Sequence, residues 1–124
     1  MLKQALQYIH QLEFDYIIRL MMNEKYFLPP WESAEVLHCR KLYKRFLILN
    51  KKYPNEIIVP TREIDEFWHN HILHTQEYYN DCMAIFGHYR HHTPSSATDE
   101  EIKILKNGSI KTQELYFLEF SEYL

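Results

Sequence analysis

The sequence predicts an all-α protein, a single domain of about five to six helices that covers residues 1–124. Three observations support this fold class. Apolar residues recur at spacings of three and four in most segments, which is the period of an α-helix. Two glycines in 124 residues disfavour turn-rich β folds and exclude a glycine-rich nucleotide-binding loop. The apolar fraction of 46% and the charged fraction of 25% are ordinary for a folded domain.

The first predicted helix covers residues 2–23 and is apolar on two sides. One arc follows the i, i+3, i+4 pattern from the start of the segment. A second arc, roughly opposite, begins in the middle of the helix. A helix that is apolar on two sides is either central in the fold or shared with a partner. We therefore treat this second arc as a candidate partner contact; its members are Phe14, Ile18, Met21 and Met22.

A second helix is expected from Ser33, which is a suitable N-cap, to about Lys52, shortly before Pro54. One face is apolar and suits the core. The other side carries a basic arc that could attract an acidic partner. The arc contains Arg40, Lys41, Lys44, Arg45, Lys51 and Lys52, with Leu37 and Ile48 as apolar residues among them.

The central part of the chain begins with a short extended segment, residues 56–60. Thr61 then starts a third helix, whose acidic residues lie near its positive end. The sequence leaves open whether residues 61–86 form one helix or two. If they form two, Thr75 caps the second helix, and Gly87 suits the left-handed position at its end.

The C-terminal part begins with a loop over residues 88–97. Thr98 and Glu101 have the spacing of a capping box, which predicts the start of a short helix. We expect that helix to end at Gly108. A last helix, apolar almost all round, is predicted for residues 112–124.

Charge, cysteine content and hydropathy limit the cellular compartments and the partner classes that we expect. The net charge of −3 does not indicate a dedicated nucleic-acid binder. Two cysteines, Cys39 and Cys82, do not make a disulfide framework. No apolar stretch approaches the length of a membrane span, and no signal peptide is visible at the N-terminus. We therefore expect a cytoplasmic protein without a membrane partner.

Histidines are concentrated in one region. On a helix, the side chains of Asp65 and His69 share one face at i, i+4, and those of His71 and His74 share another at i, i+3. His69 and His71 point about 200° apart, so they do not easily hold one ion together. Six of the eight histidines belong to this region: His69, His71, His74, His88, His91 and His92.

These residue types suit a metal site. Asp65 and His69 would need further ligands, from Cys82 or from the loop histidines His91 and His92, and zinc or iron would fit such a mixed set. The alternative is a buried polar network without metal that joins two helices and the loop. Cys82 is also a conceivable nucleophile, but a lone cysteine on an apolar face is more often core. No established catalytic motif is present, so we assign no catalytic residue.

The same region resembles a known family over residues 60–94. The pattern reads P-x(4)-D-x-x-W-H-x-H-x-L, then Y-x-x-D-C, then F-G and a histidine-proline ending. It is similar to the glycine-rich domain-containing-protein-like family, a domain of unknown function in plants and bacteria. The resemblance implies a helical domain and little about activity. The matching residues are Pro60, Asp65, Trp68, His69, His71, Leu73, Tyr78, Asp81, Cys82, Phe86, Gly87, His91, His92 and Pro94.

Two hypotheses of function come from different classes. The first is a non-catalytic regulatory module, an adaptor or inhibitor, that docks onto another protein or forms a homodimer through the second apolar arc and the basic arc. The second is a metal-dependent protein or enzyme that uses Asp65, His69, Cys82 and a loop histidine. RNA binding through the basic arc is a third hypothesis, which a steep salt dependence of affinity would support.

Overall fold

The computed structural model describes all 124 residues and contains six α-helices and no β-strand. This confirms the predicted all-α fold. One hydrophobic core joins residues from all helices. None of the helices has the length and the apolar character needed to cross a bilayer. The helices are α1 (Leu2–Gln11), α2 (Asp15–Met21), α3 (Ser33–Lys52), α4 (Arg62–Leu73), α5 (Thr75–Phe86) and α6 (Asp99–Phe120).

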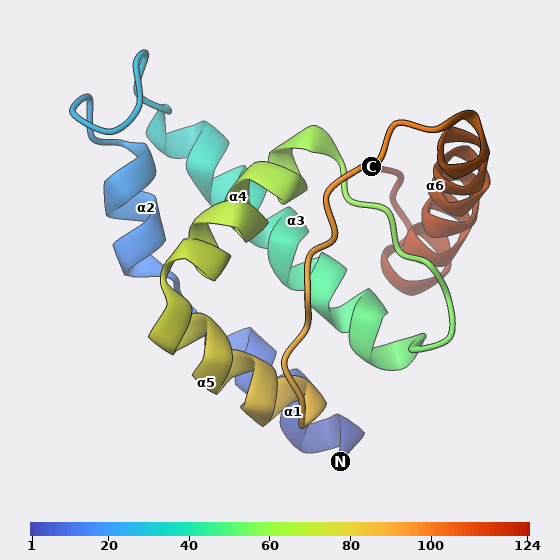
Figure 1. Cartoon of the computed structure of the whole chain (residues 1–124). Helices are drawn as coiled ribbons and strands as arrows, with labels where there is room; N and C mark the ends of the chain where they lie inside the picture. The colour runs from blue at the N-terminus through green and yellow to red at the C-terminus, as the bar shows by residue number, and fades with distance from the viewer.

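Helix α3 lies at the centre, and α1, α2 and α4 pack against it, while α5 packs on α1 and α4 (Figure 1). Helix α6 stands apart from this group. The connection between α3 and α4 runs between α6 and the other helices, and the loop after α5 crosses the molecule to reach α6 (Figure 1). Helix α6 is joined to the fold by these two connections and by direct contacts with α3, among them the ion pair between Lys52 and Glu119 at 2.7 Å.

The predicted single helix over residues 2–23 is wrong, because the chain breaks between α1 and α2. Phe14 adopts a left-handed backbone conformation with φ of 57° and turns its ring into the core. Lys44 Nζ donates to the backbone oxygens of His10 (2.9 Å) and Leu12 (2.8 Å) at the break. Arg40 Nη1 donates to the Glu13 oxygen at 3.1 Å. The residues of the second arc thus lie at or after the break, in and around α2, and not on a second side of α1.

The predicted second helix is confirmed as α3, with one change at its start. Glu32, not Ser33, is the N-cap, and it forms a capping box with Glu35. Nine residues of α3 are buried, which explains its central position. Among them is Ile48, which is 6% exposed although the sequence placed it within the basic arc.

Residues 61–86 form two helices, which settles the alternative that the sequence left open. Thr61 caps α4 as expected, since its side chain accepts from the backbone N–H of Ile64. The break falls at His74, whose Nδ1 donates to the Asn70 carbonyl at 2.7 Å. Thr75 is the first residue of α5 rather than its cap. Gly87 ends α5 with φ of 76°, as predicted.

The predicted break at Gly108 is wrong, because α6 continues through it. Gly108 lies where α6 approaches the α3–α4 connection, and a Cβ there would come within 3.0 Å of Val59 Cγ2. Thr112 secures the same contact: its hydroxyl donates to the Gly108 carbonyl at 2.7 Å and accepts from the Val59 N–H at 2.9 Å. The glycine therefore permits close packing and does not end the helix.

Candidate metal centre

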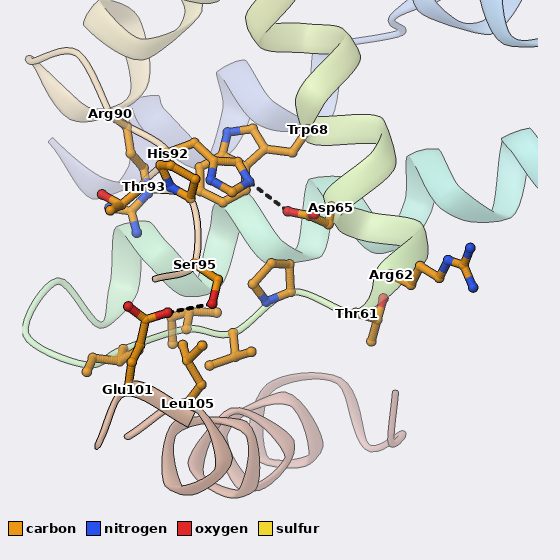
Figure 2. A pocket seen from close by; sticks show the side chains of 15 residues that line it. Thr61, Arg62, Asp65, Trp68, Arg90, His92, Thr93, Ser95, Glu101 and Leu105 are labelled. Atoms are coloured by element: carbon orange, nitrogen blue, oxygen red, sulfur yellow. Dashed lines mark hydrogen bonds and ion pairs between the residues drawn. The ribbon is translucent and has the colours of Figure 1, made fainter. Parts of the chain in front are cut away.

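Helix α4 presents Asp65 and His69 one turn apart, and the loop between α5 and α6 brings His92 against them. His92 Nε2 lies 2.7 Å from Asp65 Oδ1 and 3.0 Å from His69 Nε2. His69 Nε2 lies 3.4 Å from Asp65 Oδ2. Figure 2 shows the contact between His92 and Asp65. We call Asp65, His69 and His92 the triad.

Aromatic packing holds His92 in this position. Its ring stacks on that of Trp68, with centroids 4.1 Å apart and an angle of 24° between the planes. Trp68 Nε1 donates to the hydroxyl of Tyr78 at 3.1 Å, and that hydroxyl donates to the Arg90 carbonyl at 2.5 Å. The buried Trp68 and Tyr78 therefore fix both the imidazole plane and the loop that carries it.

With the Asp65 carboxylate ionised, no placement of protons on the two imidazoles satisfies all three contacts of the triad. If His92 Nε2 donates to Asp65, a protonated His69 Nε2 would face that N–H at 3.0 Å, and an unprotonated His69 Nε2 would turn its lone pair toward Asp65 Oδ2 at 3.4 Å. If His69 Nε2 donates to His92 instead, the His92 lone pair faces the Asp65 oxygen at 2.7 Å. A cation between the three atoms would remove both conflicts, since all three would then act as electron-pair donors.

The separations within the triad approach those of a metal site. With Zn–N distances of about 2.0–2.1 Å, the ligand atoms of a tetrahedral zinc site lie about 3.3 Å apart. The longest separation in the triad, 3.4 Å, fits such an edge, whereas 3.0 and 2.7 Å are shorter, so His92 would move outward by about 0.3–0.6 Å to share an ion with the other two. Three protein ligands with a fourth position free for water or substrate is the pattern of catalytic rather than structural zinc sites.

The triad is open to two cavities. A cavity of about 700 Å³ lies between α4, the α5–α6 loop and α6, and includes Asp65 and His92 in its wall (Figure 2). A second cavity of about 620 Å³ is lined by all three triad residues. The triad therefore lies where a ligand in either cavity could reach a bound ion.

A second histidine–aspartate cluster lies inside the protein, with only Tyr8 at its edge partly exposed. His71 Nε2 donates to Asp81 Oδ2 at 2.7 Å, and His71 Nδ1 accepts from the hydroxyl of Tyr43 at 2.7 Å. Tyr8 donates to Asp81 Oδ1 at 2.6 Å. Burial lowers the pKa of His71, against the opposing effect of Asp81, so the imidazole is neutral. We call Tyr8, Tyr43, His71 and Asp81 the buried network.

Two of the predicted metal ligands lie elsewhere. Cys82 is buried on α5, 2% exposed, and does not belong to the triad. Burial raises the pKa of its thiol, which makes it a poor nucleophile and a poor ligand at neutral pH. His91 is exposed and packs edge-on against Tyr89 instead. The structure thus joins Asp65 and His69 with only one of the two proposed loop histidines.

The fold itself engages most of the predicted basic surface. Arg40 and Lys44 donate to the carbonyls of the α1–α2 break. Arg45 donates to the Tyr116 hydroxyl at 2.8 Å, and its guanidinium lies 4.7 Å from the centroid of the Phe120 ring. Lys41 is the exposed member of this group, and it has no internal partner. These cations join elements of the fold, which weakens their assignment as a steering patch.

The apolar residues predicted to contact a partner also fall into two groups, those buried in the core and those exposed. Phe14 and Met21 are core residues, 3% and 0% exposed, so neither contributes to a docking surface. Ile18 is partly buried against the core. Met22 and Leu37 are exposed, at 41% and 42%. The reason is the break at Phe14, which turns the second arc inward.

Sequence reasoning missed Arg90 and Tyr43, which line the large cavity and the buried network respectively. Neither carried a signal, because each acts through a contact with a residue far away in the sequence. His71 and Asp81 did carry one, since both belong to the quoted pattern, but spacing alone did not show that they pair.

Comparison with known proteins gives one match. The UCP032817-like family matches residues 4–115, most of the chain. The chain belongs to this family. The family is uncharacterised, which agrees with the expected domain of unknown function but does not identify the glycine-rich domain-containing-protein-like family itself. No curated protein and no solved structure matches the chain.

Proposed function

We propose that the protein binds a divalent transition-metal ion, zinc or ferrous iron, through Asp65, His69 and His92, and acts through the open coordination position of that ion. The observation that carries the proposal is the convergence of three ligand atoms at 2.7, 3.0 and 3.4 Å, which no arrangement of protons on the imidazoles satisfies beside an ionised carboxylate. Two histidines and one carboxylate form the ligand set of several zinc hydrolases and of ferrous oxygenases. The neighbouring cavities provide room for a substrate.

The test is metal content. Untagged protein, purified without chelator or metal column, should contain about one equivalent of zinc or iron by elemental mass spectrometry. Apoprotein should also take up one equivalent of Zn²⁺ or, without oxygen, Fe²⁺. The ion present in the protein as purified identifies the class, because Zn²⁺ binds most such sites more tightly than Fe²⁺ whatever the native metal is. Asp65→Asn, His69→Ala and His92→Ala should each lose the ion while circular dichroism shows an intact fold.

Matched controls are present in the chain. His91→Ala removes a histidine directly beside His92, and Cys82→Ser removes the other predicted ligand; both should keep full metal content. Wild-type protein that takes up neither ion would overturn the proposal. Equal metal content in His69→Ala and His91→Ala would also contradict it, because binding would then not depend on the triad.

A second candidate function, docking, is favoured by a different surface from the one predicted. Helix α6 exposes a set of large apolar side chains, which is unusual for a helix that already has partners. Ile110 is 57% exposed and lies near the middle of α6. Ile102 and Phe117 lie within about 80° of it around the helix. The exposed set comprises Ile102, Ile104, Leu105, Ile110, Phe117 and Leu118.

The charges on α6 favour a second copy of this chain as the occupant. Lys106 and Glu114 stand four residues before and after Ile110. An antiparallel pair of α6 helices centred on Ile110 places each Lys106 opposite Glu114 of the other copy, while the two Ile110 side chains meet. Such a self-complementary interface is isologous and closes as a dimer.

The oligomeric state tests this candidate. Light scattering at micromolar concentration should give twice the chain mass for the wild type and the single-chain mass for Ile110→Glu. Lys41→Glu, an exposed charge change on α3, should remain dimeric. A monomeric wild type, or an Ile110→Glu variant that stays dimeric, would exclude pairing through α6.

A further inference from the structure

Arg90 is a partly buried cation without a counter-ion. Its Nη2 donates to Asn50 Oδ1, and its Cζ lies 5.7 Å from the centroid of the Phe86 ring. Its Nε is buried without a hydrogen-bond partner. No carboxylate forms an ion pair with it, although other lysine and arginine side chains of the chain pair with glutamates. A desolvated guanidinium normally has an acidic partner, so its absence calls for an explanation.

The surroundings of Arg90 fix its side chain rather than neutralise it. Asn50 is 3% exposed and donates through Nδ2 to the Phe46 carbonyl at 2.8 Å, so its oxygen is directed at the guanidinium. The Arg90 carbonyl accepts from the Tyr78 hydroxyl. Burial lowers the pKa of Arg90 but leaves it a cation at neutral pH. The remaining terminal nitrogen, Nη1, has no partner in the chain and is not fully buried.

Arg90 and the triad share the large cavity. Arg90, His92 and Asp65 are all lining residues, and Figure 2 shows them around the same space, with Ser95 and Leu105 on the side of α6. His92 follows Arg90 by two residues on one loop. A guanidinium is suited to hold a carboxylate or phosphate group in a fixed orientation. An anion held there would lie in the cavity whose wall contains Asp65 and His92, two of the three proposed metal ligands.

We propose that this cavity binds a small anionic ligand, a carboxylate or phosphate compound, and that Arg90 is its anchor. The inference deepens the proposed function and rests on it for one point, namely that the ligand is the substrate of the metal site. The anchor itself needs no metal. The aliphatic and aromatic lining, Ile57, Val59, Trp68 and Leu105, would pack against the rest of the ligand.

Trp68 lies in the cavity wall and reports on binding. In a Trp31→Phe background it is the only tryptophan, so its fluorescence follows this cavity alone. Inorganic phosphate and acetate serve as probes, each titrated into apoprotein and into protein loaded with one equivalent of zinc. We expect a saturable change of fluorescence with at least one of them. Arg90→Gln should weaken that binding by about tenfold or more, with zinc content unchanged.

Two further variants make the result decisive. Arg62→Gln removes the other arginine of the cavity, which is exposed, and should change the dissociation constant by less than about twofold. Arg90→Lys keeps the charge without the planar fork and should bind with intermediate affinity. If Arg90→Gln does not fold, Arg90→Lys serves as the test of the anchor in its place.

The possible results separate the two proposals. If zinc binds but neither anion does, or if Arg90→Gln and Arg62→Gln weaken binding equally, the anchor is wrong and the metal site stands. If the anion binds through Arg90 but the wild-type protein takes up no metal, the anchor stands and the metal site is wrong. Tighter anion binding in the zinc-loaded form than in apoprotein would support both.

Discussion

Helix α4 carries two histidines, His69 and His71, that are two residues apart and have opposite environments. His71 is 1% exposed, and each of its ring nitrogens has one well-placed partner. His69 is about half exposed, and its Nε2 faces another imidazole nitrogen and a carboxylate. Both clusters contain histidine and aspartate. They differ in whether the protein itself satisfies every donor and acceptor.

The difference separates structural from functional chemistry. In the buried network, Asp81 accepts two hydrogen bonds and Tyr43 donates one, so the set is complete without an ion. A complete polar network inside a core adds rigidity and specificity. In the triad, three electron-pair donors converge at the edge of two cavities. An incomplete set that a cation would complete is the arrangement expected of a binding site.

The largest effect should come from removing His71. His71→Ala leaves Asp81 without its imidazole partner, leaves the Tyr43 hydroxyl without an acceptor, and opens a cavity in the core. We expect it to lower the free energy of unfolding by about 3–5 kcal/mol. The measurement is urea unfolding followed by circular dichroism, with EDTA present so that metal does not contribute.

His69→Ala is the matched control, because it changes the same residue type on the same helix. Without metal it should change the free energy of unfolding by no more than about 0.5 kcal/mol. Similar losses in the two variants would show that the triad is as structural as the buried network, and the contrast between them would disappear.

A second effect should appear only when metal is added. At a free zinc concentration of one hundred times the dissociation constant, the wild type should gain about 2.7 kcal/mol in the free energy of unfolding. His69→Ala should gain almost nothing, since it has lost one of three ligands. His91→Ala should gain as much as the wild type. Equal stabilisation of all three proteins would place the zinc elsewhere.

The sequence predicted local features of the fold better than the breaks between helices. The Thr61 cap and the Gly87 helix end depend on neighbouring residues, and both are confirmed. The break at Phe14 depends on Lys44, which is thirty residues away and binds the freed carbonyls. The continuation of α6 through Gly108 depends on close contact with Val59. The spacing of apolar residues along one segment does not show which distant residues will contact it.

The same division holds for the triad. The i, i+4 spacing of Asp65 and His69 was sufficient to place them together. The choice of His92 over its neighbour His91 was not predictable, because it depends on stacking against Trp68. Cys82 was a reasonable candidate by residue type alone, but α5 turns it into the core. Ligands on one helix can be read from spacing, whereas ligands from loops require the tertiary structure.

The smallest effect tests the rim of the buried network. Tyr8→Phe removes one hydrogen bond to Asp81 at a position that water can partly reach, so it should lower the free energy of unfolding by about 1 kcal/mol.

Burial, followed by the hydrogen bond to Asp81, raises the pKa of Tyr8 to about 12 in the folded protein. The unfolded chain ionises this tyrosine near pH 10, so it binds fewer protons than the folded state between pH 10 and about pH 12. Stability therefore falls as the pH rises through this range, and the wild type should lose more of it than Tyr8→Phe. Unfolding curves of both proteins at pH 8 and pH 11 measure the effect. A difference between them that does not shrink at the higher pH would show that Tyr8 supports the network by packing and not through its hydroxyl.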